Sequence, residues 1–373
     1  MADIVTIVGA RPQFIKAAVI NYFLKNWPGG LPLSQFLINT GQHYDHSLSD
    51  VFFKDLPFLE PDQTMNTGSG TPGSQLACMI PLIEETLQRE SPKAVLIYGD
   101  TNSTLAGALA AVKLDIPIIH QEAGCRLPYR KQVPEEWNRV LSDHAAHLCL
   151  AVTKHDLKNL YLEGITEARA LLTGDIMFDL FLINKDRALR ESPYPNAINE
   201  EKGSYHICTI HRVENTDNPE KLKKIFERLF DSKKTIVLPL HPRTRNALDK
   251  NNLMKFCQQN KSLKLIEPLS YTDFQALLLG AHRVITDSGG VMREAYFAKK
   301  PCIVPRNAVW FPEIVEAGWA VSTGNDFDKF KTLINNFDAP DSYPEIFGDG
   351  KASKKVISAC LDTINLRDYT EPW

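Results

Sequence analysis

Short apolar runs alternate with longer amphipathic stretches along almost the whole chain. Six apolar runs in the first half predict strands, and a stretch of helical periodicity follows most of them. These runs cover residues 4–8, 35–38, 94–98, 117–120, 148–152 and 170–172. Strands that alternate with helices favour a parallel sheet covered by helices on both faces.

The alternation is interrupted near residues 179–196, where the pattern turns from helical to polar and proline-rich, as is typical of a linker. It resumes with predicted strands at 205–210, 235–240, 263–266, 283–286 and 302–304, and SKKVISACLDTI near the end has the periodicity of a closing helix. We therefore expect an α/β protein with two Rossmann-like domains facing a cleft, at residues 1–178 and 179–355, followed by a C-terminal helix at 356–373.

Composition narrows the class of protein. The length of 373 residues suits two domains, and a formal net charge of -3 argues against bulk attraction to nucleic acid or anionic membrane. No apolar run approaches the roughly 18 residues of a membrane-spanning helix, and no signal-peptide pattern opens the chain. The seven cysteines lack the spacing of a disulfide framework or a metal site. We expect a soluble, cytoplasmic protein with free thiols and no bound metal.

Polar and ionisable side chains follow several predicted strands of the first domain. Ligands of open α/β sheets bind outside the carboxyl ends of the strands, so these side chains are expected at the mouth of a cleft. Arg11 and Lys16 follow the first strand, where backbone N–H groups could assist them in binding an anion; surface cations in a tight turn are the alternative. Asp100 and Glu122 end later strands, and Asp100 could equally be a turn or cap residue.

Glu135 and Arg139 open the predicted helix PEEWNRVLSD. Their i, i+4 spacing alone slightly favours a helix-surface ion pair, worth only about 0.3–0.5 kcal/mol, over a role in chemistry.

The second domain carries a glycine pair at a predicted helix start. Ser288, Gly289 and Gly290 follow an apolar run and precede VMREAYFAKK. Glycines at a helix start let the backbone approach a phosphate closely, whereas Ser288 could simply cap the helix. Glu294 would repel a phosphate but suits the vicinal hydroxyls of a ribose, because a carboxylate can accept two hydrogen bonds.

Two histidines follow strands of the same domain. His211 and His241 lie after the runs at 205–210 and 235–240. Either could hold a diphosphate and help a leaving oxygen depart, and His241 could equally be structural. The segment GSGTPG at 68–73 has dinucleotide-type glycine spacing but follows no apolar strand, so we expect a mobile loop over the cleft and no cofactor.

These motifs together resemble, in order, those of the non-hydrolysing UDP-N-acetylglucosamine 2-epimerase family. They are GARPQFIK, TGQHYD, GDTNSTLAG, HQEAGCR, PEEWNR, TGDIMFD, HRVEN, LPLHPRTR, TDSGG with Glu294, and GDGKAS. The residues of these motifs also resemble those of the branch that acts on UDP-2,3-diacetamido-glucuronic acid. The resemblance implies a GT-B-like fold, a homodimer and a UDP-sugar substrate. From the net charge and the lack of a membrane-spanning run, we expect no nucleic-acid or membrane partner.

The resemblance also implies residue roles. Asp100, Glu122 and Glu135 match the catalytic carboxylates of the family, which overrides the surface ion pair for Glu135. The diphosphate side would be held by Arg11, Lys16, His211, Ser288, Gly289, Gly290 and Arg306, with His211 also taking part in catalysis. Glu294 would take the ribose and Phe274 would lie by the uracil. Further candidates for contact with substrate or an allosteric ligand are Gln42, His43, Arg139 and His241.

One segment departs from the family pattern. Where the family usually has Arg-x-x-Thr-Glu-(Arg/Trp), this chain has Arg306-Asn-Ala-Val-Trp-Phe311. Val309 and Trp310 therefore replace a threonine and a glutamate in the loop Ala308–Phe311, which bears on the identity of the sugar.

The implied reaction is reversible inversion at C2 of a UDP-N-acetylhexosamine, of the UDP-GlcNAc to UDP-ManNAc type. The C2–H bond is not next to a carbonyl, so direct proton removal would be too costly, and elimination of UDP followed by its re-addition avoids that step. Alternatives are 2-epimerisation of UDP-2,3-diacetamido-glucuronic acid, glycosyl transfer from a UDP-sugar by a GT-B enzyme, a hydrolysing epimerase, and a non-catalytic nucleotide-sugar sensor.

Overall fold

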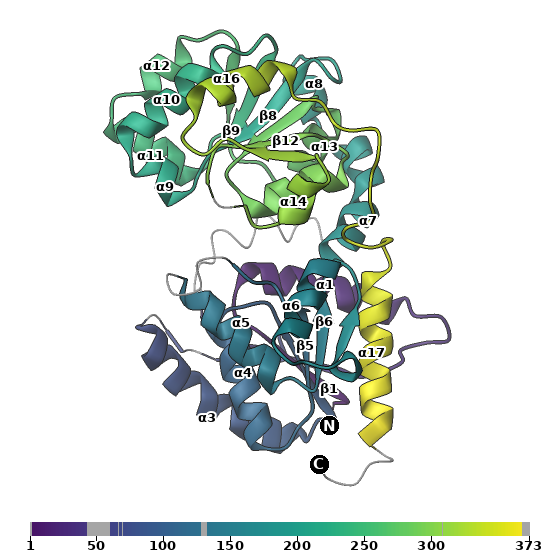
Figure 1. Ribbon diagram of the computed structural model, residues 1–373. Coiled ribbons are helices and arrows are strands. Elements are labelled where there is room, and N and C mark those ends of the chain that lie inside the picture. The colour runs from purple at the N-terminus through teal and green to yellow at the C-terminus, as the bar shows by residue number, and fades with distance from the viewer. Residues whose placement is uncertain are drawn as a thin grey trace. The chain divides into compact units, whose positions relative to one another are not determined.

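A computed structural model describes residues 2–42, 60–65, 67–68, 70–127, 133–307 and 309–367 (Figure 1). The chain divides into two compact units, one of Met1–Leu180 with Glu345–Trp373 and one of Phe181–Pro344. Each unit has one fully parallel sheet with helices packed against it. The predicted α/β class with two Rossmann-like, parallel-sheet domains is therefore confirmed.

The sheet of the first unit has the strand order β3-β2-β1-β4-β5-β6-β7. The strands are β1 (Ile4–Val8), β2 (Gln35–Asn39), β3 (Gln63–Thr64), β4 (Ala94–Tyr98), β5 (Ile118–Ala123), β6 (Leu148–Ala151) and β7 (Ala170–Leu172). Every residue of β1 and β4 is buried, as expected for central strands covered on both faces.

Helices cover this sheet. They are α1 (Arg11–Lys25), α3 (Pro72–Glu90), α4 (Asn102–Lys113), α5 (Pro134–Ala145), α6 (Lys154–Leu162), the short 3-10 turn Glu167–Arg169, and α17 (Ala352–Arg367). The C-terminal α17, yellow in Figure 1, packs against α1 and β4, and α4 lies between α3 and α5. The end of the chain thus completes the core of the first unit.

The sheet of the second unit has the order β10-β9-β8-β11-β12-β13. Its strands are β8 (Tyr205–Thr209), β9 (Thr235–Pro239), β10 (Leu263–Ile266), β11 (Arg283–Thr286), β12 (Cys302–Val304) and β13 (Ala320–Ser322). Its helices are α8 (Tyr194–Ala197), α9 (Val213–Thr216), α10 (Pro219–Leu229), α11 (Pro242–Lys250), α12 (Met254–Gln258), α13 (Tyr271–Gly280), α14 (Gly289–Phe297), α15 (Pro312–Glu316) and α16 (Phe327–Asn336).

One predicted segment differs. Most of the linker expected at 179–196 is helical, because α7 runs from Ile176 to Glu191, and α8 follows almost at once. The buried side chains of Leu180, Phe181 and Ala188 give this stretch an apolar face. No helix in the described ranges is both long and apolar enough to cross a membrane. All seven cysteines are free thiols, and five of them are buried.

Each sheet reverses its strand order at one point. In the first unit β1 and β4 are neighbours, with β2 and β5 on their outer sides. In the second unit β8 and β11 are neighbours, with β9 and β12 on their outer sides. Such a switch point separates the two flanking turns and leaves room for a ligand at the carboxyl ends of the strands. The fold therefore marks the turns after β1 and β4, and after β8 and β11, as candidate sites.

Candidate active site

The first unit brings two carboxylate–cation pairs to its switch point. Lys16, from the second turn of α1, pairs with Glu122 at the end of β5. Arg139 of α5 pairs with Asp100, which follows β4. Both cations are nearly buried, whereas the carboxylates keep 24% and 29% of their side chains exposed. Each carboxylate is thus held by a nearly buried cation and remains partly exposed to solvent.

Glu122 occupies an unusual backbone position. Its φ is +69°, in the left-handed region that residues with a Cβ rarely adopt. The pairing register between β5 and β6 shifts at this residue, as in a β-bulge. Strained positions of this kind gather at functional sites, where they re-aim a side chain.

Glu135 lies at the start of α5 and is exposed. Among the described residues, the partner of Arg139 within its own helix is Glu136, at 2.8 Å and i, i+3 spacing. In place of the i, i+4 ion pair considered from the sequence, the structure shows a buried i, i+3 pair of Arg139 with Glu136.

The other candidates of the first unit lie close by in the fold. Arg11 is the first residue of α1, and burial lowers the pKa of its guanidinium. Gln42 Oε1 accepts hydrogen bonds from the backbone N–H of Ser103 at 2.9 Å and from its hydroxyl at 2.7 Å. Gln42 therefore holds the start of α4. His43 lies outside the described residues.

The second unit brings two histidines together at its own switch point. The rings of His211 and His241 stack with centroids 4.9 Å apart. Burial lowers the pKa of His211, and the nearby His241 and arginines add to this effect while Asp287 opposes it. Burial likewise lowers the pKa of His241. A diphosphate arriving beside these rings would favour their protonation, as general acid catalysis of a leaving group requires.

His241 also has a structural contact. Its Nδ1 accepts a hydrogen bond from the backbone N–H of Arg243 at 3.1 Å and so caps α11. The structural alternative considered for this residue is therefore present in the fold, together with the ring stack.

The buried carboxylate of Asp287 organises the turn after β8. It accepts hydrogen bonds from the backbone N–H groups of His211 at 3.0 Å and Arg212 at 2.9 Å, and from Asn215 Nδ2 at 2.9 Å. These contacts fix the turn in which His211 lies. Asp287 was missed from the sequence, although it is adjacent to Ser288.

Helix α14 begins at the same switch point. Ser288 is its N-cap residue, but within this fully described helix its side chain makes no capping hydrogen bond. Gly289 is buried beneath Trp310, since a Cβ there would lie 2.7 Å from Trp310 Cδ1. Gly290 is exposed, and the nearest atom to an added Cβ would be 3.8 Å away. The open approach to this helix start is therefore at Gly290.

The remaining candidates of the second unit lie after β12, in α14 and in α13. Arg306 follows β12, contacts Glu214 Oε1 at 2.7 Å and donates to the backbone carbonyl of Asp287 at 3.3 Å. Glu294 is half-buried within α14, and Phe274 is half-buried in α13. In the loop that departs from the family pattern, the ring of Phe311 lies under the guanidinium of Arg293, with Arg293 Cζ 5.4 Å from the ring centroid. Ala308 is outside the described residues.

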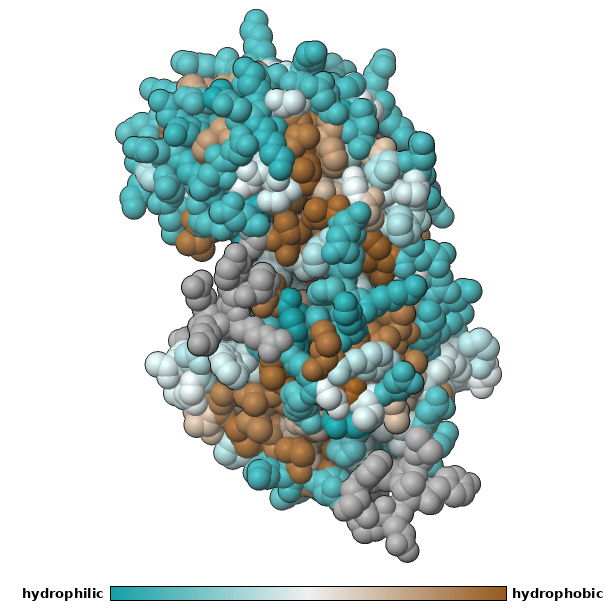
Figure 2. All heavy atoms as spheres, viewed as in Figure 1, coloured by the Kyte–Doolittle hydropathy of each residue, from teal (hydrophilic) through white to brown (hydrophobic). Residues whose placement is uncertain are grey.

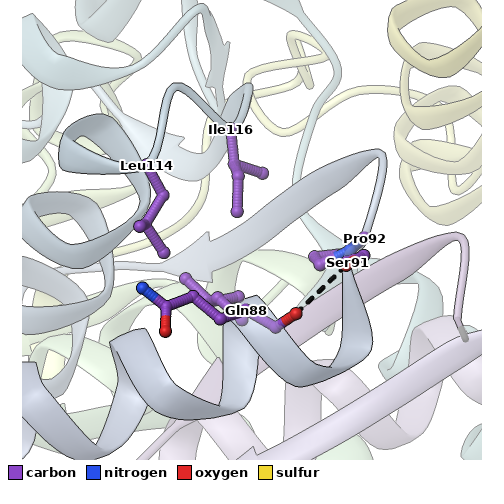
Figure 3. A pocket seen from close by; sticks show the side chains of 6 residues that line it. Gln88, Ser91, Pro92, Leu114 and Ile116 are labelled. Atoms are coloured by element: carbon purple, nitrogen blue, oxygen red, sulfur yellow. Dashed lines mark hydrogen bonds between the residues drawn. The ribbon is translucent and has the colours of Figure 1, made fainter.

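The pocket drawn in Figure 3 lies elsewhere. It has a volume of about 370 Å³ and is lined by Leu87, Gln88, Ser91, Pro92, Leu114 and Ile116. These residues end α3 and α4 and precede β4 and β5, so they lie at the amino edge of the sheet. Asp100 and Glu122 lie at the opposite, carboxyl edge, and the pocket is therefore separate from the candidate site.

Comparison with known proteins agrees with the resemblance seen in the motifs. Residues 32–361 match the family model of UDP-N-acetylglucosamine 2-epimerase. A UDP-N-acetylglucosamine 2-epimerase homolog of Methanococcus maripaludis is 40% identical over 95% of this chain and 98% of its own length. A UDP-2,3-diacetamido-2,3-dideoxy-D-glucuronate 2-epimerase of Pseudomonas aeruginosa is 37% identical over 95% of this chain and 98% of its own length.

A solved structure extends the similarity to three dimensions. The Methanocaldococcus jannaschii UDP-GlcNAc 2-epimerase in complex with UDP-GlcNAc and UDP superposes with a TM-score of 0.80 and 36% identity, covering 96% of this chain and 98% of that one. With a family match over most of the length and relatives above 30% identity, the chain belongs to the UDP-N-acetylglucosamine 2-epimerase family.

Proposed function

We propose that this chain is an isomerase that reversibly inverts C2 of a UDP-N-acetylhexosamine, converting UDP-GlcNAc to UDP-ManNAc without hydrolysis. The observation that carries the proposal is the placement of Asp100 and Glu122 at the carboxyl ends of the adjacent strands β4 and β5 of a family member, each held by a nearly buried cation. Two carboxylates on neighbouring strand ends suit proton removal from one face of a sugar and proton return to the other.

The reaction proceeds by elimination and re-addition. The C1–O bond breaks, its electron pair leaves with UDP, and a carboxylate takes the C2 proton, so that a 2-acetamidoglucal remains. A proton then returns to C2 on the opposite face, and the UDP oxygen re-forms the bond to C1. Asp100, Glu122 and Glu135 supply the acid and base groups. His211 and the cations Arg11, Lys16 and Arg306 stabilise the departing diphosphate.

The second unit has the features of a nucleotide site. The start of α14 offers backbone N–H groups at Gly290 and the uncapped hydroxyl of Ser288 to a phosphate. Glu294 in the same helix would accept hydrogen bonds from the ribose hydroxyls. Phe274 would pack against the uracil.

We also propose a homodimer formed through an apolar surface of the first unit. This α3–α5 face is defined by Leu82 of α3, Val112 of α4, and Trp137 and Leu141 of α5, all of them exposed on helices that lie side by side. Figure 2 shows hydrophobic residues gathered over the part of this unit that contains α3 and α4. Exposed apolar patches of this kind mark protein–protein contacts.

The test is isotope exchange during turnover. Purified protein is incubated with UDP-GlcNAc in heavy water, and the recovered nucleotide sugars are analysed by NMR. The proposal predicts deuterium at C2 in both epimers and no stoichiometric release of UDP. Asp100→Asn should slow exchange by about 10²–10⁴-fold, because it removes an acid–base group of nearly the same shape. Absence of deuterium at C2 for every UDP-N-acetylhexosamine tried would contradict the proposal.

A second candidate is 2-epimerisation of UDP-2,3-diacetamido-2,3-dideoxy-D-glucuronate, favoured by the 37% identity to the Pseudomonas aeruginosa relative. The two substrates differ at C3 and C6 and not at the reacting carbon, so the same exchange assay compares them by kcat/KM. A glycosyltransferase, in contrast, would leave C2 unlabelled and would need an acceptor.

A further inference from the structure

The turn that carries Asp100 is held by side chains from three other elements. Each of three consecutive backbone carbonyls, from the end of β4 through Asp100, accepts a hydrogen bond from a side chain distant in sequence. The donors are Gln13 Nε2 to Tyr98 O at 2.6 Å, His120 Nε2 to Gly99 O at 2.8 Å, and Asn138 Nδ2 to Asp100 O at 2.9 Å. The middle contact lies directly before the carboxylate-bearing residue.

The backbone conformation of Gly99 gives the hydrogen bond from His120 its structural role. Its φ is +63°, so the residue uses the conformational freedom that glycine has and other residues lack. The peptide between Gly99 and Asp100 has little intrinsic preference for one orientation. Its direction, and with it that of the Asp100 side chain, therefore depends on the contacts that hold the turn, among them the hydrogen bond to the Gly99 carbonyl.

His120 is the side chain that binds this carbonyl, and Asp143 holds its ring. Its Nε2 faces the Gly99 carbonyl, and its Nδ1 lies 2.6 Å from Asp143 Oδ1. The other oxygen of Asp143 accepts from the N–H of Gly124 at 3.0 Å and contacts Arg126 Nη2 at 2.7 Å. A backbone carbonyl can only accept, so Nε2 is the donor to Gly99, and Asp143 fixes the ring from the Nδ1 side.

Stability alone gives no reason for this arrangement. The side chains of His120 and Asp143 are completely buried, and Arg126 connects them to Glu163 in a chain of charges. Buried ion pairs lose so much hydration that an apolar pair of similar volume stabilises a fold equally well or better. What an apolar pair lacks is a strong, directional donor aimed at the Gly99 carbonyl.

We propose that His120, held in place by Asp143, is a positioning residue that fixes the Gly99–Asp100 peptide and so aims the Asp100 carboxylate at the substrate. The inference rests on the proposed function, since the role of Asp100 belongs to it. His120 does not touch the substrate and acts only through the Gly99 carbonyl.

Two amide substitutions separate positioning from packing. In His120→Gln the side-chain amide nitrogen can take the place of Nε2 and still donate to Gly99. In His120→Asn it takes the place of Nδ1 and donates only toward Asp143. Each variant loses one buried hydrogen bond, so both should lower Tm to a similar extent. We expect kcat for C2 deuterium exchange to stay within about threefold in H120Q and to fall about 10²-fold in H120N, with KM for UDP-GlcNAc nearly unchanged in both.

Glu163→Gln is the matched control, because it weakens the same chain of charges at its far end without touching the turn. It should lower Tm and leave kcat unchanged. If H120N does not fold, Asp143→Asn replaces it. That variant removes the negative charge that faces His120 Nδ1 and orients the ring, and it should lower kcat at least tenfold at temperatures where it remains folded.

The outcomes are distinct. Equal kcat in H120N and H120Q, wild-type kcat in D143N, or a kcat loss in E163Q matching that in H120N, would overturn the positioning role while wild-type exchange upholds the proposed function. Absence of exchange in the wild type with every UDP-N-acetylhexosamine would overturn both.

Discussion

At the residue scale, Glu122 combines a reactive group with a costly backbone conformation. Holding an L-residue in the left-handed region costs about 1–2 kcal/mol, a cost that glycine avoids. Glu122→Ala and Glu122→Gly both leave Lys16 without this carboxylate, and both should lose activity. We expect the glycine variant to be more stable than the alanine variant by about 1 kcal/mol, which urea unfolding of the two proteins would measure. Equal stability would show that the fold stores no strain at this residue.

His206 in β8 makes a separate prediction, on pH. Its ring is buried, stacks on His282 with centroids 5.6 Å apart, and has no hydrogen-bond partner among the described residues. Burial, helped by the charge of Arg283, lowers its pKa to about 3. The unfolded chain takes up this proton below about pH 6.5 whereas the folded protein does not, so stability is lost as pH falls from 6.5 toward 3.

Replacing the ring removes this penalty. Between pH 7 and pH 5, the wild type should lose about 2 kcal/mol more stability than His206→Leu. The value follows because pH 5 lies about 1.5 units below the pKa of histidine in the unfolded chain. The measurement compares unfolding of the wild type and the variant at the two pH values. An equal loss in both proteins would mean that His206 is protonated in the folded state.

Which site residues the sequence reveals depends on where their partners lie. Asp100, Glu122 and His211 follow apolar runs directly, so their place at strand ends could be predicted from local pattern. Gln13 and His120 could not be predicted, because what they do depends on partners such as Tyr98 and Asp143, which are 85 and 23 positions away. Local pattern thus finds the side chains that face a ligand and misses those that hold them in place.

At the element scale, the two glycines at the start of α14 have different surroundings, because Gly289 packs against Trp310 and Gly290 faces open space. Gly289→Ala would force Trp310 to move and should destabilise the protein by about 1–3 kcal/mol. Gly290→Ala meets open space, so Tm should hold, but its Cβ would stand where a phosphate approaches the helix. We expect G290A to weaken UDP binding at least tenfold by calorimetry. Wild-type UDP affinity in G290A would place the diphosphate away from this helix start.

Elements with a strong pattern of their own could be predicted, and elements defined by their neighbours could not. The eleven predicted strands all form, because each is a short apolar run, and the central ones, such as β1 and β4, are buried throughout. β3 and β13 have only two and three residues and exist through pairing with β2 and β12. The polar positions of α7 favour a linker when only local pattern is considered, yet the helix forms because Leu180, Phe181 and Ala188 are buried.

At the scale of the whole molecule, the C-terminal segment is part of the first unit. Asp179, before the second sheet, accepts hydrogen bonds from the backbone N–H groups of Ala352 and Ser353 at 3.1 and 2.6 Å, which start α17. Val356, Ile357, Cys360 and Ile364 are then buried. The core of the first unit therefore needs residues from both ends of the chain.

The association of whole molecules gives the last prediction. If the α3–α5 face joins two copies, a charge at Trp137, which is 57% exposed, would be buried without a partner in the dimer but solvated in the monomer. We expect Trp137→Asp to shift the mass measured by light scattering from dimer to monomer without lowering the Tm of the monomer. Leu162→Asp is the control, because Leu162 is 75% exposed at the end of α6, outside this face, and should leave the dimer intact. A monomeric wild type at micromolar concentration, or a W137D protein that remains dimeric, would rule out this face as the interface.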